Sequence, residues 1–244
     1  MAAGRPLERS IGTLMTIAEN IARIRANMAA AAREAGRDPK EILLVGASKM
    51  NDAAACREAV AAGIDALGEN RVQEMTEKLA QGAYEGAPLH FIGHLQRNKV
   101  RQVVGRVALI ESVGSLELAK EIQRQAEKLG VTQDVLLEVN IGGEESKSGF
   151  LPKELRDGAA AVRELDRLRV LGLMAIPPVE REPHGNLPYF VEVSRLYVDI
   201  SRSLYHNSFV YLSMGMSDDF EDAIAAGATM VRVGSAIFGR RHYQ

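Results

Sequence analysis

The chain has 244 residues, of which 46% are hydrophobic and 25% are charged, so one large α/β barrel or two small domains would suit it. A formal net charge of −2 argues against nucleic acid or an anionic membrane as a partner. The single cysteine, Cys56, excludes a disulfide within the chain and suits a reducing compartment.

Short apolar runs alternate with amphipathic stretches along the whole chain. The opening residues MAAGRPLERS lack the apolar run of a secretory signal, and no stretch is long enough to span a membrane, so we expect a cytoplasmic protein. An N-terminal helix is predicted over about 10–36, and the apolar run 42–47 predicts a strand buried on both faces. Further strands are predicted at 66–68, 89–92, 108–110, 135–139, 170–174, 209–212 and 230–233. Helices are predicted between them, at 52–62, 71–81, 95–104, 116–129, 153–165, 189–206 and 218–226.

Eight strands that alternate with helices imply a parallel sheet, and this number in about 200 residues favours closure into a (β/α)₈ TIM barrel with an extra N-terminal helix. The alternative is an open, doubly wound sheet. No linker divides the sequence, so we expect a single domain over 1–244. The proline-rich stretch 177–188 predicts a long loop of open role rather than a domain boundary.

In such a barrel the functional site lies where the strands end, and phosphate is frequently held by the loops after strands seven and eight. Gly215 and Gly234 permit a close backbone approach there, and Ser213 and Ser235 offer hydroxyl groups. Ser217 reads as the N-cap of the following helix, with Asp218 and Asp219 in its first turn. The alternative interpretation is two ordinary glycine turns.

Lys49 follows the first predicted strand and would point into the barrel mouth, where desolvation favours the neutral, nucleophilic amine. The alternative is a lysine that extends to solvent. A phosphate site opposite an imine-forming lysine is what pyridoxal 5′-phosphate (PLP) requires, and Arg232 would reach the pyridine nitrogen. Glu69 reads as a structural ion-pair partner rather than a general base. His90 and His94 straddle a strand end, so we expect no metal site.

Six segments carry a resemblance to a known family. They are ASK at 47–49, GEN at 68–70, HFIGHLQRNK at 90–99, VNIGGEESKSGF at 139–150, GLMAI at 172–176, and SMGMSDDFEDAIAAGATMVRVGSAIFG at 213–239. From about residue 40 onward the chain resembles the PLP homeostasis proteins, also called YggS-like proteins or proline synthase co-transcribed homologues. The resemblance implies the barrel fold of the N-terminal domain of alanine racemase.

The resemblance also implies how the cofactor is held. Lys49 would form the Schiff base, Arg232 would face the pyridine nitrogen, and Asn70 would lie close to the cofactor. The phosphate would contact Ser213, Gly234 and Ser235, with Met214 and Gly215 in the same loop. The family often has threonine at position 235, which keeps the hydroxyl. His94 and Arg97 occupy variable positions of their segment and are given no role.

The residues around the cofactor bear on whether the chain catalyses a reaction. A permanently cationic Arg232 weakens the ring as an electron sink, and racemases take a second acid–base tyrosine from a β-rich domain for which this sequence has no room. Tyr211 within a strand and Tyr84 in a glycine-bounded loop are poor substitutes. We therefore expect a non-catalytic PLP-binding protein, a monomer or weak dimer, that supplies the cofactor to apo-enzymes. The alternative is a slow, racemase-like PLP enzyme that acts on amino acids.

Overall fold

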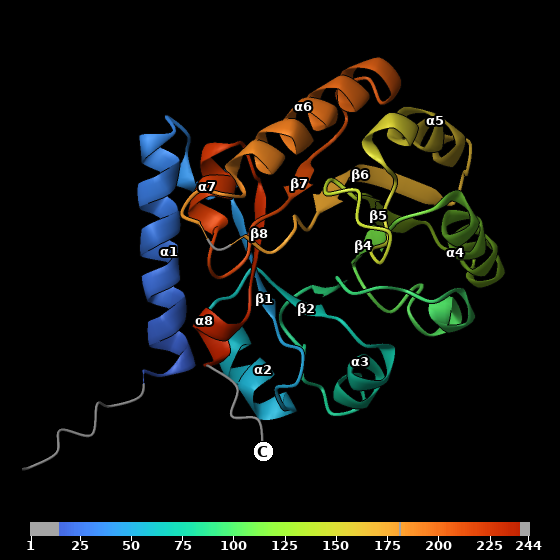
Figure 1. Ribbon diagram of the computed structural model, residues 1–244. Helices are drawn as coiled ribbons and strands as arrows, with labels where there is room; N and C mark the ends of the chain where they lie inside the picture. The colour runs from blue at the N-terminus through green and yellow to red at the C-terminus, as the bar shows by residue number, and fades with distance from the viewer. Residues whose placement is uncertain (1–14, 181, 240–244) are drawn as a thin grey trace, which may run out of the picture.

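A closed barrel of eight parallel strands forms the centre of the molecule (Figure 1). The structure is a computed structural model that describes residues 15–180 and 182–239. The strands begin within two residues of their predicted starts: β1 (Leu43–Ala47), β2 (Ala66–Glu69), β3 (Leu89–Phe91), β4 (Leu109–Val113), β5 (Gln133–Val139), β6 (Leu168–Ala175), β7 (Tyr211–Ser213) and β8 (Met230–Val233). Because β1 pairs with β8 as well as with β2, the predicted TIM barrel is confirmed and the open sheet is excluded.

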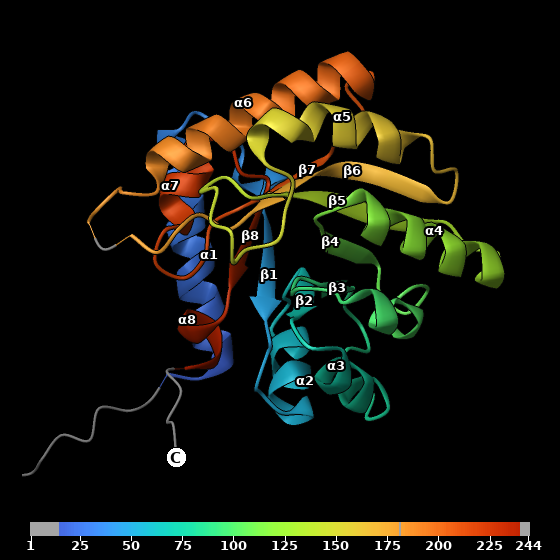
Figure 2. The same ribbon diagram turned by 45° about the vertical axis from the view of Figure 1, so that its right-hand side comes forward.

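Helices surround the barrel on its outer face (Figure 2). They are α1 (Ile17–Glu34), α2 (Ala53–Ala61), α3 (Val72–Leu79), α4 (Leu116–Leu129), α5 (Pro152–Arg163), α6 (Leu187–Leu204), α7 (Phe220–Ala225) and α8 (Ser235–Phe238), with 3₁₀-helices η1 (Pro39–Glu41) and η2 (Arg97–Gln102). The helix predicted at 95–104 is wrong in type, since it is the short 3₁₀-helix η2. The sequence did not predict η1 or α8. No helix among the described residues is both long and apolar enough to cross a membrane.

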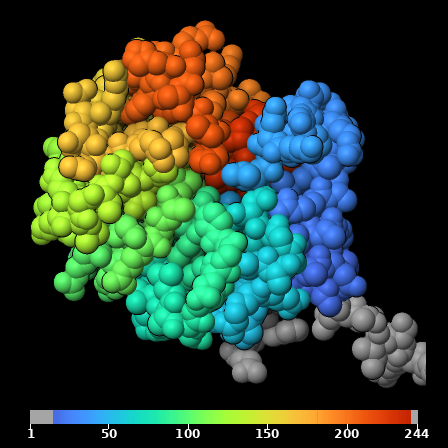
Figure 3. Space-filling model, turned by 180° about the vertical axis from the view of Figure 1, so that it is seen from behind, coloured from blue at the N-terminus to red at the C-terminus, as the bar shows by residue number. Residues whose placement is uncertain are grey.

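The helix α1 packs against helices from both ends of the barrel sequence. It begins at Ile17 because Thr16 and Glu19 form a capping box, and the predicted helical positions 10–14 lie outside the described residues. Asn20 Nδ2 donates to Ile237 O at 2.9 Å, and α1 packs beside α7 and α8 (Figure 1). Seen from behind, the N-terminal segment fills the surface between the C-terminal elements and the segment that carries α2 (Figure 3). The extra helix therefore covers the seam where β8 meets β1.

The interior of the barrel changes from apolar to polar towards the carboxyl ends of the strands. Its apolar layer consists of Val45, Ala66, Leu109, Leu136, Met174 and Met230. Successive side chains of a strand point to opposite faces, so the next inward positions lie two residues later. These positions carry polar side chains on three of the strands, namely Glu111, Glu138 and Arg232, and all three are buried. The same count places Lys49 four residues after Val45, at the carboxyl ends of the strands, where the chain turns into the mouth of the barrel.

Candidate functional site

Arg232 is held at the centre of a buried polar network. Its Nη1 donates to Ser213 Oγ at 2.5 Å and its Nη2 donates to Ala175 O at 2.9 Å. Ser213 Oγ donates in turn to Glu111 Oε2 at 2.6 Å, and His90 Nδ1 lies 2.8 Å from Glu111 Oε1. Because these groups come from five strands, namely β3, β4, β6, β7 and β8, barrel closure fixes the guanidinium from two sides.

The network is electrostatically balanced. Burial alone would raise the pKa of Glu111, but the hydrogen bond and charge of His90, together with Arg232 and Ser213, hold that pKa below its ordinary value. Burial lowers the pKa of Arg232, and the carboxylates of Glu111 and Glu138 oppose the change. A guanidinium keeps its proton even so. The interior therefore offers a fixed cation just below the mouth.

Ser213 is the last residue of β7 and is paired inside the barrel. The Ser213 hydroxyl is fully buried and bonded to Glu111 and Arg232, so in this structure it supports the guanidinium. Met214 is also buried, and its N–H donates to Met230 O at 3.1 Å. Gly215 has φ +90°, and a Cβ there would lie 2.5 Å from Ala223 Cβ, so the turn requires glycine.

Ser217 joins the two loops that the sequence predicted for phosphate. Its Oγ accepts from Gly234 N–H at 3.4 Å and lies 3.2 Å from Ser235 Oγ. The predicted N-cap role of Ser217 is wrong, since the N-cap of α7 is Asp219. Met216 N–H donates to Asp219 Oδ1 at 2.7 Å, which closes this turn. The contacts of Ser217 with Gly234 and Ser235 were not predicted from the sequence, although its place two residues after Gly215 was a usable signal.

Closure of β1 against β8 brings the predicted lysine to this edge. The register pairs Val45 with Arg232, and a Cβ on Gly234 would lie 3.2 Å from Ala47 O. Lys49 lies two residues after Ala47 and is half-buried. The structure thus gathers the predicted residues of β1 and β8 at one side of the mouth.

A cavity of about 340 Å³ opens at the mouth and is lined by Asn70, Ile92, Gly93, His94, Glu138, Val139, Asn140, Ser146, Lys147, Ser148 and Ile176. Asn70 Oδ1 is buried and has no hydrogen-bond partner among the described residues. An unpaired buried acceptor is costly, so this position fits a ligand that donates a hydrogen bond. His94, given no role from the sequence, lies in the same lining, as does Glu138, which sequence reasoning missed.

Glu138 predicts a pH-dependent stability difference. Burial raises its pKa, against a hydrogen bond from Ser148 Oγ at 2.9 Å and the charges of Arg232 and His94. The folded protein therefore favours the protonated carboxyl, and this contribution to stability is present below the ordinary pKa and lost as pH rises through the raised one. We expect Glu138→Gln to be more stable than the wild type at neutral pH, with the difference vanishing in acid.

Urea midpoints of both proteins across a pH series measure this difference. The matched control is Glu154→Gln, because Glu154 is an exposed carboxylate on α5. A Glu138→Gln variant that is less stable than the wild type at neutral pH would show that the charged form is the one the fold favours.

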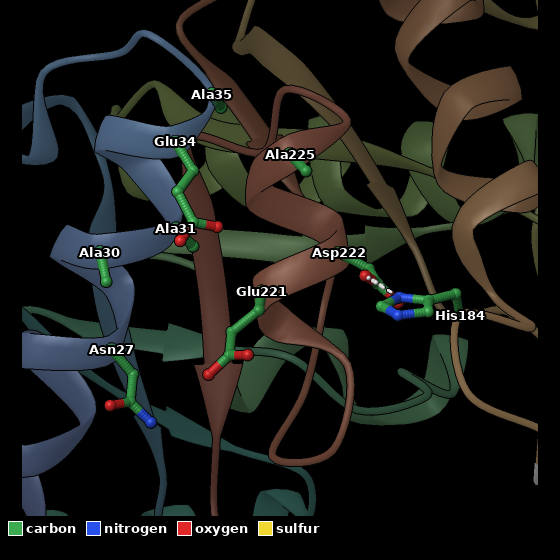
Figure 4. Close-up of a pocket in the computed structure, with 9 residues that line it drawn as sticks. All are labelled: Asn27, Ala30, Ala31, Glu34, Ala35, His184, Glu221, Asp222 and Ala225. Atoms are coloured by element: carbon green, nitrogen blue, oxygen red, sulfur yellow. Dashed lines mark hydrogen bonds and ion pairs between the residues drawn. The ribbon is translucent and has the colours of Figure 1, made fainter.

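A second cavity, of about 470 Å³, lies on the flank of the molecule between α1 and α7 (Figure 4). None of the residues predicted for the cofactor lines it. His184 Nδ1 lies 2.7 Å from Asp222 Oδ1, which ties the loop after β6 to α7. The predicted long loop is therefore anchored along the side of the barrel, and this cavity is separate from the mouth.

The chain is similar to known proteins over most of its length. The family described as "Alanine racemase, N-terminal domain" matches residues 20–242. A protein named "Pyridoxal phosphate homeostasis protein" in Aquifex aeolicus is 42% identical over 94% of this chain and 100% of its own length. The protein of that name in Escherichia coli strain K12 is also 42% identical, over 93% of this chain and 97% of its own.

Two solved structures extend the comparison. PipY of Synechococcus elongatus, solved with PLP bound, has a TM-score of 0.80 and 33% identity over 92% of this chain and 100% of its own. Alanine racemase of Clostridium difficile has a TM-score of 0.68 and 18% identity, over 91% of this chain and 57% of its own. At that identity the racemase likeness concerns the fold alone.

Proposed function

The chain belongs to the pyridoxal phosphate homeostasis proteins, which share the fold of the alanine racemase N-terminal domain, and from this premise we propose that it binds PLP at Lys49 and supplies it to apo-enzymes. We propose that residues 1–244 form one domain that acts in the cytoplasm as a monomer or weak dimer. The function is PLP homeostasis, with binding and release rather than turnover.

The observation that carries the proposal is the meeting of β1 and β8. It sets the turn at Lys49 beside Gly234, with Arg232 one inward position below. The cofactor supplies an aldehyde that condenses with a primary amine. Lys49 would be the attachment point, and the buried acceptor Asn70 Oδ1 would take a hydrogen bond from the ring substituents.

We propose that the phosphate binds where the loop after β7 meets the loop after β8. Ser217 and Ser235 hold their hydroxyls 3.2 Å apart, and Gly234 adds a backbone N–H. Gly215 and Met214 shape the neighbouring turn. Ser213 would contribute through Arg232, because its hydroxyl accepts from the guanidinium at 2.5 Å. Hydrogen bonds to a charged phosphate are worth roughly 1.5–3 kcal/mol each, enough to distinguish PLP from pyridoxal.

The electrostatics favour a carrier over an enzyme. Arg232 is a permanent cation, so a pyridine nitrogen beside it would stay unprotonated and withdraw electrons weakly. Neither tyrosine considered from the sequence reaches the mouth: Tyr211 packs with the apolar interior layer, and Tyr84 donates to Glu69 at 3.0 Å behind β2. These placements support binding without racemisation.

Three measurements test this function. We expect the protein to retain PLP more tightly than pyridoxal, and to restore an apo PLP-dependent enzyme by transferring the cofactor intact. Incubation with amino acids in deuterium oxide should leave their Cα hydrogens in place. Steady Cα exchange that disappears in Lys49→Ala would overturn the carrier function and establish the racemase-like alternative.

A further inference from the structure

A buried polar cluster lies behind the Lys49 turn, between the barrel wall and α3. Its centre is Glu69, whose Oε1 accepts from Ser48 Oγ at 2.6 Å, from Lys78 Nζ at 2.6 Å and from Tyr84 OH at 3.0 Å. Lys78 is only 6% exposed and Glu69 is fully buried. The cluster confirms the predicted ion-pair role of Glu69. It also includes Ser48, the residue before Lys49.

The same helix holds the backbone on both sides of Lys49. Lys78 Nζ donates to Ser48 O at 2.8 Å, and Glu74 Oε2 accepts from Met50 N–H at 2.7 Å. Glu74 and Lys78 are four residues apart, so they lie on one face of α3. Met50 has φ +62°, a left-handed conformation that is uncommon for a residue with a long side chain. Two side chains of α3 therefore hold a turn that the local sequence does not favour.

A purely structural role explains this arrangement poorly. A buried ion pair contributes little net stability compared with apolar residues of similar size. Here Lys78 serves two acceptors, the Glu69 carboxylate and the carbonyl that precedes Lys49. Loss of Lys78 would leave that carbonyl with only the Asn51 N–H as its donor, at 3.0 Å, and would loosen the turn.

We propose that Lys78 is a positioning residue for Lys49: by binding Ser48 O and Glu69 it fixes the Ser48–Met50 turn and so directs the Lys49 side chain over the mouth cavity. This inference rests on the proposed attachment of PLP at Lys49. Glu74 acts with Lys78 on the other side of the turn.

The test compares Lys78→Met with the double variant Glu69→Gln/Lys78→Met. The single variant leaves a buried carboxylate without its cation, so we expect lower stability and weaker PLP binding. The double variant replaces the charges with neutral groups of similar size, so its urea midpoint should recover. Its PLP affinity should stay at least about tenfold below wild type, because the Lys49 amine would no longer be held in the position in which it reacts. Arg169→Met, which removes an exposed ion pair to Asp134 at the opposite end of the barrel, is the control.

A second readout needs no cofactor. Hydrogen–deuterium exchange of the apo protein should accelerate at the Met50 amide in both Lys78 variants and stay unchanged in Arg169→Met. If the Lys78 variants fail to fold, Glu74→Ala replaces them and should show the same local acceleration with weaker PLP binding.

A double variant with wild-type PLP affinity and wild-type Met50 exchange would overturn the positioning role. So would a Glu74→Ala variant that matches the wild type in both measurements. A wild-type protein that binds no PLP would defeat the proposed function instead, while the exchange experiment would still report whether α3 holds the turn.

Discussion

Lys49→Ala is expected to abolish covalent attachment of PLP. The wild-type protein mixed with PLP should show a visible absorption band, and borohydride should fix the cofactor on the peptide that contains Lys49. The variant should show neither, and its affinity should fall at least about a hundredfold, because a covalent bond formed within a preset site gains a large effective concentration. The remaining phosphate and Arg232 contacts would leave only weak, reversible binding.

The matched control is Lys147→Ala, because Lys147 is a lysine that lines the mouth cavity. Its Nζ donates to Pro177 O at 3.3 Å and pairs with Glu144, so we expect its removal to leave the labelling at Lys49 intact. Labelling that persists in Lys49→Ala and disappears in Lys147→Ala would move the attachment point to the opposite side of the mouth.

Glu111→Ala is expected to have the largest effect on stability. The substitution leaves the buried Arg232 without its nearest carboxylate and removes the acceptor for Ser213 Oγ. Breaking a buried charge pair by removing one partner costs about 3–5 kcal/mol. Urea denaturation at neutral pH measures the loss, and Asp134→Ala supplies the control, because its exposed pair with Arg169 should be worth no more than about 1 kcal/mol.

The pH dependence of that loss has a defined sign. The pKa of Glu111 is lowered in the folded protein, so its contribution is present above the ordinary pKa of a carboxyl and is lost as pH falls through the lowered value. The stability difference between the wild type and Glu111→Ala should therefore shrink in acid. An equal difference at every pH would mean that packing, not charge, is what Glu111 contributes.

The strands were predictable because a strand buried on both faces is a nearly continuous apolar run. Such runs identified β1 and β8, and with them Lys49 and Arg232 at the edge where the barrel closes. The segment 95–104 was harder, because Leu95, Val100 and Val103 have helical spacing but their burial against the barrel produces only η2. Local spacing does not reveal whether a turn closes over three or four residues.

The polar contacts could not be predicted from the sequence, for a different reason. Ser213 reads as a loop hydroxyl, and nothing near it reveals Glu111, 102 residues away, as its partner. Ser217 and Asp219 are both residue types that favour an N-cap, and Asp219 takes that position because the helix begins only at Phe220. Glu138 follows a run of apolar strand residues without a motif of its own. The contacts of Ser213 and the burial of Glu138 exist only once the barrel is closed.

That closure has a consequence for biosynthesis. The strand β1 can pair with β8 only after β8 has been synthesised. For the same reason α1 can pack against α7 and α8 only near the end of synthesis. Contacts between the two ends of a chain are slow to form, and domains complete such pairings late in synthesis. Lys49 emerges early from the ribosome, yet its cofactor site is assembled last. A chain truncated before Gly234 would carry the lysine without the site, so retention of PLP would report that translation and folding had both finished.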